Sequence, residues 1–348
     1  MRVDVLIVGA GLAGACCGML LQQQGLQVLA VDQADLQAKD KLCGGLLTPR
    51  AMEELQRIYG EDAQGLFAQH FDSMHVRCAG HVVDVDGLQL CSLRRRDLDR
   101  FALTRFLDAG GMLSDRTRVT SLDARNRRAV LATPAGELPV EYTLLVGADG
   151  ATSWLRRHLT GARPQTVPSL EVPVRSNGTS LTFRYDADLQ GYCWYIPCGD
   201  GGCIGVDGKQ GTPPARLRSA LRDFAAEVGV GYDPALLRGA LIPRGNDLRL
   251  AVPQGFFVGD AAGLACPSTG EGIFFALRSA ACLADYIAGG KPYEQAMAPL
   301  MLQLRRQHAL LPLLFDQQVM EGTLALARVT GLGEPRMVRF AFRLFASF

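Results

Sequence analysis

Charged side chains are scarce in this sequence. They make up 20% of its 348 residues, and 36 basic residues nearly balance 35 acidic ones, for a formal net charge of +1. A protein that binds nucleic acid through a general basic field needs a clear excess of positive charge. We therefore expect no nucleic-acid partner. Hydrophobic residues make up 48% of the chain, which is enough for a large core and argues against disorder.

The sequence also lacks the patterns of metal sites and of disulfide scaffolds. Its five histidines are scattered and form no HExxH motif, and its ten cysteines include no CxxC pair. We therefore expect no bound metal ion. The cysteines are expected to stay reduced, as they do in a cytoplasmic protein.

One long stretch, residues 5–31, contains no charged side chain. Its length would suffice for a membrane span or a signal peptide. However, five glycines and four glutamines interrupt it, and neither kind of segment is interrupted in that way. The sequence therefore predicts a cytoplasmic protein that is at most peripheral to a membrane.

The first 32 residues predict a dinucleotide-binding βαβ unit. A buried strand over residues 3–8 leads into the turn Gly9-Ala10-Gly11-Leu12-Ala13-Gly14, then into a helix to about Gln24 and a second strand that ends at Asp32. In this GxGxxG motif the first glycine permits a tight turn, the second lets a pyrophosphate approach the backbone, and the third lets helix and strand pack closely. The carboxylate of Asp32 can bind a ribose diol.

Two later segments favour FAD over NAD as the dinucleotide. A strand over residues 144–148 leads into Asp149, and a strand over residues 256–259 leads into Asp260. An NAD dehydrogenase needs neither of them. An extended FAD molecule does, because a second acid can bind its ribityl hydroxyls. The helix expected from Gly272 can also direct its positive end at the flavin ring.

The middle of the chain has a different hydrophobic pattern. From about residue 165 to 250, hydrophobic and polar residues alternate and turn residues are frequent, which predicts an antiparallel sheet. Earlier in the chain, helices are expected over 50–59 and 96–109, and a loop is expected over 39–50. The end of the chain is expected to be helical, with breaks near Pro312 and at 331–335. The expected units are an FAD-binding domain (1–75, 92–165 and 251–300), a substrate domain (76–91 and 166–250) and a C-terminal helical segment (301–348).

These elements together resemble the flavoprotein monooxygenases related to p-hydroxybenzoate hydroxylase. Within that superfamily the chain is most similar to the geranylgeranyl reductase family. The narrower resemblance is carried by the Cys-Gly-Gly loop at 41–45, the Arg-x-x-Leu-Asp element at 95–99, the Tyr-x-Trp-x-x-Pro strand at 192–197 and the loop at 267–273. Ile196 departs from the family by replacing an aromatic residue, and Cys198 stands where the reductases often have lysine.

The resemblance implies a fold, a cofactor and a reaction. The fold class would be α/β, with a Rossmann-like FAD-binding domain of the glutathione reductase type, an inserted antiparallel substrate domain and C-terminal helices. The reaction would be an FAD-dependent reduction of a carbon–carbon double bond in a hydrophobic, isoprenoid-like substrate. Alternatives are an FAD- and NAD(P)H-dependent monooxygenase, a flavin-dependent halogenase and a flavin-binding protein without turnover. No lysine lies between Lys41 and Lys209, which disfavours the halogenase.

No second GxGxxG motif exists in the sequence. NAD(P)H would therefore be a transient electron donor, or a protein donor would take its place. Residues 336–348 interleave three arginines with four phenylalanines and contain no acid. This segment either packs on the body of the protein or makes a peripheral membrane contact.

The candidate site residues fall into two groups, and no catalytic acid or base is identified. Glu271 is expected to support the start of a helix rather than act as an acid. The substrate-pocket candidates are Cys43, Tyr192 and Trp194. The cofactor-binding candidates are Gly9, Gly11, Leu12, Ala13, Gly14, Asp32, Cys43, Gly44, Gly45, Arg95, Asp149, Gly259, Asp260, Gly270, Gly272 and Ile273.

Overall fold

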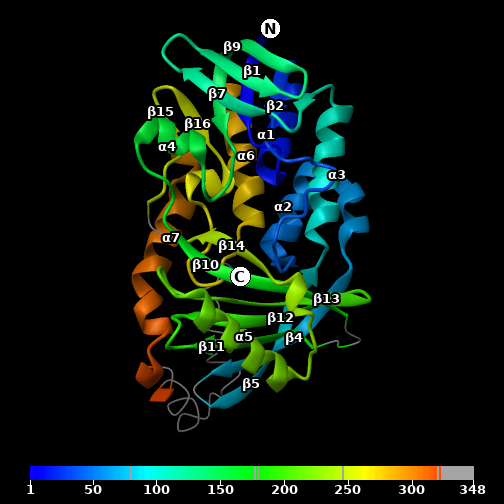
Figure 1. Cartoon of the computed structure of the whole chain (residues 1–348), viewed down its shortest axis with the longest axis vertical. Helices are drawn as coiled ribbons and strands as arrows, with labels where there is room; N and C mark the ends of the chain where they lie inside the picture. Colours follow the sequence, from blue (N-terminus) through cyan, green and yellow to red (C-terminus); the bar gives the residue numbers. More distant parts are fainter. Residues whose placement is uncertain (79, 176–177, 179, 245–246, 320, 323–348) are drawn as a thin grey trace.

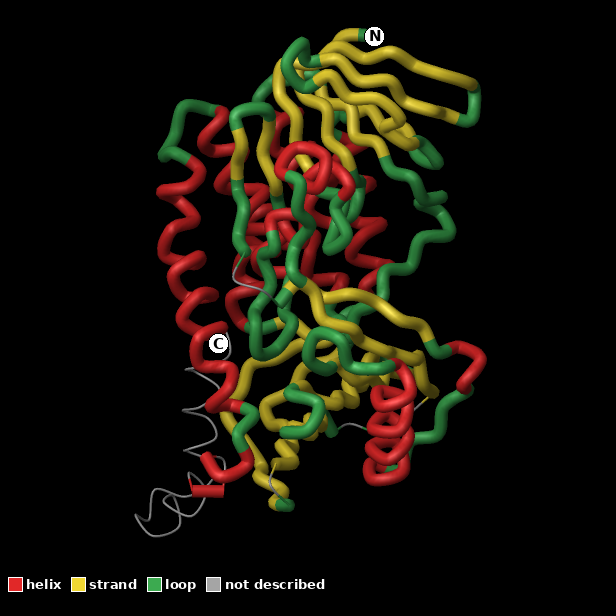
Figure 2. Tube along the Cα trace, turned by 60° about the vertical axis from the view of Figure 1, so that its left-hand side comes forward, coloured by secondary structure: helices red, strands yellow, loops and turns green. Residues whose placement is uncertain are grey.

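Two β-sheets, one above the other in Figure 1, organise the molecule. The computed structural model describes the chain except for residues 79, 176–177, 179, 245–246, 320 and 323–348. Helices pack around the upper sheet, and a long helix runs down one side past both sheets (Figures 1 and 2). The α/β class is confirmed. The segment 336–348, with its expected membrane contact, and the break expected at 331–335 lie outside the described residues.

The upper sheet is built on the βαβ unit that the sequence predicts. Strand β1 pairs in parallel with β2 and with the second half of β9, and all four residues of β2 are buried. The strand order is β15-β16-β9-β1-β2-β6. Their bounds are Arg2–Val8 (β1), Val28–Val31 (β2), Met112–Ser114 (β6), Gly136–Gly147 (β9), Ala251–Val252 (β15) and Gly255–Phe257 (β16).

A meander of three antiparallel strands extends the upper sheet and was not anticipated from the sequence. Strand β7 (Arg118–Asp123) pairs with β8 (Arg128–Thr133), and β8 pairs with the first half of β9. Every residue of β7 is exposed or half-buried. A strand with no buried face lacks the hydrophobic alternation by which a strand is recognised.

Helix α1 (Leu12–Gln23) packs between α3 (Arg95–Asp108) and α6 (Ile273–Ile287). Its contact with α3 depends on two glycines. A Cβ atom at Gly18 would lie 2.7 Å from the ring of Phe106, and one at Gly111 would lie 2.0 Å from it. The expected helix over 50–59 is confirmed as α2 (Pro49–Tyr59). The shorter helices are α4 (Trp154–Thr160) and the 3-10 turns η1 (Gly60–Leu66), η2 (Pro234–Leu236) and η3 (Gly259–Ala262).

The lower sheet has the order β14-β10-β13-β12-β11-β4-β5-β3. The expectation of a purely antiparallel sheet is wrong at one place, because β4 pairs with β11 in parallel. β4 and β11 are far apart in sequence, so no hairpin turn dictates their direction. The bounds are Leu46–Leu47 (β3), Gln69–Cys78 (β4), His81–Ser92 (β5), Thr166–Arg175 (β10), Thr182–Asp186 (β11), Gly191–Cys198 (β12), Gly201–Asp207 (β13) and Arg238–Pro243 (β14).

Strand β12 is buried on both faces, and its residues alternate between two cores. Cys193 and Tyr195 pack with helix α5 (Pro214–Val228) on one side. Tyr192, Trp194 and Ile196 belong to a second cluster on the other side. The expected loop over 39–50 contains the short strand β3, since Leu46 and Leu47 pair with β5.

Helix α7 (Tyr293–Leu314) contacts both halves of the molecule (Figures 1 and 2). The hydroxyl of Tyr293 donates to the carbonyl of Phe257 in the upper half at 2.9 Å. Near its other end, Nδ1 of His308 lies 3.0 Å from the carbonyl oxygen of Arg244, just after β14. The helix contains Pro312 and ends at Leu314, close to the expected break. In the described part of the chain, no helix is long and apolar enough to cross a membrane.

The division of the chain into domains stays a proposal. The lower sheet takes its strands from 46–47, 69–92 and 166–243. Strand β4 begins at Gln69, inside the range first assigned to the FAD-binding domain. We therefore propose that the first boundary lies at about residue 68.

Replacing Phe106 by alanine is expected to lower the free energy of unfolding by about 3–5 kcal/mol, because it leaves a cavity between α1 and α3. Phe106 is fully buried. Its neighbour Leu107 is 44% exposed, so the control Leu107→Ala should change stability by less than about 0.5 kcal/mol. Urea denaturation of both variants measures the difference. Equal losses would contradict this packing.

Candidate functional site

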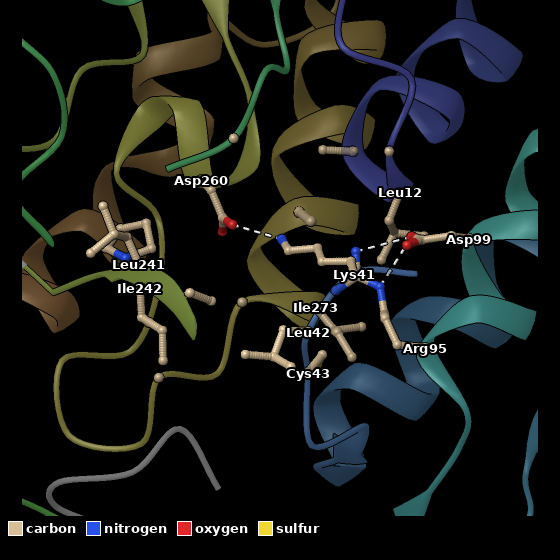
Figure 3. Close-up of a pocket in the computed structure, with 18 of the residues that line it drawn as sticks. Leu12, Lys41, Leu42, Cys43, Arg95, Asp99, Leu241, Ile242, Asp260 and Ile273 are labelled. Carbon is tan, nitrogen blue, oxygen red and sulfur yellow. Dashed lines mark hydrogen bonds and ion pairs between the residues drawn. The ribbon is translucent and has the colours of Figure 1, made fainter. Parts of the chain in front are cut away.

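A cavity of about 740 Å³ lies between the two sheets, within the size range of ligand pockets. The upper half contributes the glycine turn and the ends of β2, β9 and β16, and the lower half contributes a wall from the second sheet. Figure 3 shows part of it. The predicted site residues that line it are Gly9, Gly11, Leu12, Ala13, Asp32, Cys43, Gly44, Gly45, Arg95, Asp149, Tyr192, Trp194, Asp260, Gly270, Gly272 and Ile273. Gly14 and Gly259 are not among its lining residues.

The glycine turn has the shape that a pyrophosphate site requires. Gly9 has φ +103°, and a Cβ atom there would lie 2.3 Å from the carbonyl oxygen of Ala148. A Cβ at Gly14 would lie 1.9 Å from the carbonyl oxygen of Gly9, so Gly14 packs helix on strand rather than facing the cavity. At Gly11, in contrast, the position of a Cβ atom is open.

Helix α1 begins at this open position. Its N-cap residue is Gly11, no side chain caps it, and its first turn contains no acid. The first-turn amides therefore have no side-chain acceptor of their own, and the positive end of the helix is directed at the cavity. These features fit the pyrophosphate of FAD, which the amides of α1 would hold.

Asp32 directly follows β2 and is 7% exposed. Its carboxylate accepts hydrogen bonds from the amides of Ala10 and Ala34, both at 2.9 Å, and pairs with Nζ of Lys39 at 2.6 Å. The acid is thus fixed beside the glycine turn, as a ribose-binding carboxylate must be. The sequence analysis did not single out Lys39. A lysine in the loop seven residues after Asp32 could have indicated a partner for this carboxylate.

Two further ion pairs line the cavity (Figure 3). Nζ of Lys41 lies 2.8 Å from Oδ2 of Asp260, which connects the loop to the segment after β16. Arg95 is 8% exposed and pairs with Asp99 at 3.0 Å, one helical turn further along α3. Both acids of these pairs therefore have a cation in contact.

Asp149 lines the cavity, but its carboxylate is used locally. It accepts hydrogen bonds from the hydroxyl of Ser153 at 2.5 Å and from the amide of Leu155 at 2.9 Å. Burial raises the pKa of this carboxyl, and these hydrogen bonds lower it in part. Asp149 thus organises the start of α4 next to the cavity.

The loop before α6 corrects one expectation. Glu271 does not cap α6, because the N-cap residue is Gly272 and no side chain caps this helix. The carboxylate of Glu271 instead accepts a hydrogen bond from the hydroxyl of Thr48 at 2.6 Å. Burial raises the pKa of Glu271 to about 7.

Gly259 follows β16 and has φ +56°. A Cβ atom added to it would lie 2.9 Å from the Cβ of Ala13, so this glycine packs against the start of α1.

The Cys-Gly-Gly loop lies directly against the Tyr-x-Trp strand. A Cβ atom at Gly44 would lie 2.6 Å from Cδ1 of Ile196 and 3.3 Å from Nε1 of Trp194. The rings of Tyr192 and Trp194 lie 5.4 Å apart on the same face of β12. The hydroxyl of Tyr192 donates to the carbonyl of Thr269, which connects this wall to the loop before α6. The structure thus brings together three stretches that are far apart in the sequence.

Sequence reasoning also missed Glu171, which lines the cavity from β10. The residue is 5% exposed, and its Oε1 accepts a hydrogen bond from the amide of Cys43 at 3.2 Å. Burial raises its pKa to about 7. The available signal was an acid inside an otherwise apolar stretch, residues 170–174.

Replacing Asp32 by alanine is expected to raise the FAD dissociation constant about 10- to 100-fold, because it removes the hydrogen bond to the glycine turn and the charge-assisted hydrogen bonds that this carboxylate would make to the ribose. Asp35→Ala is the matched control, since Asp35 is exposed and bonds only within its own loop. Titration of the apoprotein with FAD, followed by flavin fluorescence, measures both. An unchanged constant in Asp32→Ala would contradict this role of the acid.

Comparisons with known proteins agree with this geometry. Residues 2–201 match the model of the family described as "FAD binding domain". A menaquinone reductase of Mycolicibacterium smegmatis is 29% identical over 87% of this chain and 80% of its own length. A geranylgeranyl diphosphate reductase of Rhodobacter capsulatus is 25% identical over 86% and 79%.

The fold comparison gives the same result. The structure of a geranylgeranyl bacteriochlorophyll reductase-like protein from Thermoplasma acidophilum superposes with a TM-score of 0.77 at 18% identity, and covers 92% of this chain and 88% of its own. The match of the family model to more than half of the residues is decisive. The chain belongs to the FAD-binding domain family, in the superfamily that includes the geranylgeranyl reductases, and is an FAD-dependent oxidoreductase.

Proposed function

We propose that this enzyme uses reduced FAD to saturate a carbon–carbon double bond in a hydrophobic, isoprenoid-like chain. The observation that carries the proposal is the cavity in which the candidate FAD-binding residues and an apolar wall lie together. The names of the curated relatives, a menaquinone reductase and a geranylgeranyl diphosphate reductase, support it.

The wall of the lower sheet suits a prenyl chain. It presents large apolar and aromatic side chains, and Glu171 is the one charged residue among the described residues of this sheet that line the cavity. Such a surface stabilises a bound hydrocarbon by removing it from water, at roughly 25 cal/mol per Å². The large apolar and aromatic residues of this wall are Leu46, Met74, Leu90, Phe183, Tyr185, Tyr192, Trp194, Ile196, Leu241 and Ile242.

The chain's own residues would bind and orient both partners. FAD, when bound, supplies the hydride for the double bond. The amides of α1 and the carboxylate of Asp32 would hold its phosphates and ribose, and the Cys-Gly-Gly loop would separate the reacting groups from water. Trp194 and Tyr192 would position the alkene. The cofactor-binding role of each predicted residue is part of this proposal.

We also propose that NAD(P)H reduces the flavin during a transient encounter, because the sequence contains no second dinucleotide motif. A protein electron donor is the alternative. Anaerobic mixing of the FAD-loaded enzyme with NADPH or NADH, while the flavin absorbance is followed, separates the two. A loss of the flavin absorbance supports NAD(P)H as the electron donor. If the flavin stays oxidised with both nucleotides but is reduced by dithionite, the protein donor is favoured.

The reductase activity is tested with anaerobic enzyme whose FAD has been reduced by dithionite. Mixing it with geranylgeranyl diphosphate, or with a menaquinone in detergent, is expected to reoxidise the flavin and to yield a product that carries two added hydrogen atoms on its prenyl chain, located there by fragmentation in the mass spectrometer after the quinone ring has been reoxidised in air. If reoxidation needs oxygen and the product gains an oxygen atom, the enzyme is a monooxygenase and the proposal is wrong.

Replacing Trp194 by alanine is expected to lower kcat/KM for the active probe at least about tenfold, because burial of a large side chain against the substrate contributes about 1.5–3 kcal/mol. The control is Tyr286→Ala on α6, which removes a 39% exposed ring outside the cavity. Steady-state kinetics at equal FAD occupancy compares the two. Equal activity of the Trp194 variant and the wild type would place the substrate elsewhere.

A further inference from the structure

Six carboxylates line the cavity, and they differ in how fully they are paired. Four are in contact with a cation or with hydrogen-bond donors at both oxygens, whereas in the two glutamates the Oε2 atom is buried and has no hydrogen-bond partner. An unpaired buried carboxylate oxygen is costly as an anion, which favours the protonated form. The six are Asp32, Asp99, Asp149, Asp260, Glu171 and Glu271.

The two glutamates come from different elements of the structure. Glu271 belongs to the loop before α6, where the hydroxyl of Thr48 donates a hydrogen bond to it. Glu171 belongs to β10 in the lower sheet, on the wall of the substrate compartment. Glu171 is the one of the two that belongs to the sheet whose aromatic side chains would hold the alkene, which favours it as the proton donor.

The sheet register places Glu171 in one row with Trp194. Glu171 on β10 is the partner of Gly205 on β13, and Gly205 is the partner of Trp194 on β12. Residues directly opposite each other on neighbouring strands point to the same face. Glu171 and Trp194 therefore project into the cavity from the same face, separated by one glycine.

The glycine lets the indole lie across the middle strand. A Cβ atom at Gly205 would be 2.2 Å from Cζ2 and 2.4 Å from Cε2 of Trp194. The ring nitrogen adjoins Cε2, and both Nε1 of Trp194 and Oε2 of Glu171 are buried without a hydrogen bond of normal geometry. The acid and the aromatic wall that would carry the alkene are thus adjacent.

The groups around Glu171 fix the position of its carboxyl group without compensating a negative charge on it. Burial raises its pKa to about 7, and the indole of Trp194, the amide of Cys43, Arg238 and the thiol of Cys203 each lower it in part. The guanidinium of Arg238, on β14, already pairs with Asp40 at 3.0 Å. No cation among the described residues forms an ion pair with Glu171.

We propose that Glu171 is the acid that protonates the substrate during double-bond reduction, an inference that rests on the proposed function. The carboxyl O–H bond breaks and a C–H bond forms at one alkene carbon, while the other carbon receives the hydride that reduced FAD supplies. The π bond is lost and FAD is oxidised. Glu171 is left as a carboxylate and takes its proton back from water.

Glu171→Gln tests the proposal, because it keeps the acceptor for the amide of Cys43 but has no acidic proton. With dithionite-reduced holoenzyme and the probe that the wild type reduces, flavin reoxidation is expected to slow about 100-fold or more, the usual contribution of a general acid. FAD affinity should not change. Glu171→Asp, which keeps the acid on a shorter side chain, should recover part of the rate.

The pH dependence adds a second readout. The donor acts in its protonated form, so the wild-type reoxidation rate should be high below about pH 7 and fall as pH rises through that value. In Glu171→Gln the reoxidation rate should no longer fall as the pH rises. Glu271→Gln is the matched comparison, because the pKa of Glu271 is also raised to about 7, and the fall should persist in that variant.

Tryptophan fluorescence reports the titration without any substrate. The chain has two tryptophans, and Trp154→Phe leaves Trp194 as the reporter. Its emission should change with a midpoint near pH 7 in that background, and the change should vanish when Glu171→Gln is added. A transition that persists with Glu171→Gln and disappears with Glu271→Gln would overturn the assignment.

The outcomes separate this inference from the proposed function. If the wild type reduces a prenyl probe and Glu171→Gln does so at the same rate, the proton comes from elsewhere and the inference is wrong, while the proposed function stands. If the reduced wild type leaves every prenyl probe unchanged, the proposed function itself fails, and the role of Glu171 fails with it.

Discussion

The loop over residues 39–45 touches both halves of the molecule, and the geometry of the cavity depends on it. At one end Lys39 reaches Asp32, and in the middle Lys41 reaches Asp260. At the other end the amide of Cys43 donates to Glu171. This short stretch therefore fixes the distance between the dinucleotide half and the wall of the second sheet.

These contacts differ in strength. The side chains of Lys39 and Lys41 are 28% and 42% exposed, and partly exposed ion pairs contribute little to stability. The backbone contacts are more restrictive. Gly45 has φ +69°, and a Cβ atom there would lie 2.0 Å from the carbonyl oxygen of Leu93. The glycine end of the loop is thus held by close packing, while the lysine side chains can rearrange around a bound dinucleotide.

The sequence predicted the parts of the site that follow from local rules. The glycine turn with Asp32 depends on a strand, a turn and a helix in succession, and each leaves a signal in hydrophobic periodicity or in glycine position. The parts that depend on pairing over long distances were missed. The parallel pairing of β4 with β11 and the row from Glu171 to Trp194 follow from sheet register, which no local pattern encodes. Glu271 was misinterpreted because its partner, Thr48, lies far away in the sequence.

Helix α7 has a mechanical consequence. A helix of 22 residues is about 33 Å long, and this one is attached to the upper half through Tyr293 and to the lower half through His308. Pro299 lies between these two anchors, and a proline inside a helix removes a backbone hydrogen bond and allows a kink. The two halves therefore cannot hinge apart without bending the helix at this point or breaking one of its attachments. The helix therefore opposes domain opening as the route by which molecules as large as FAD or a prenyl chain enter the cavity.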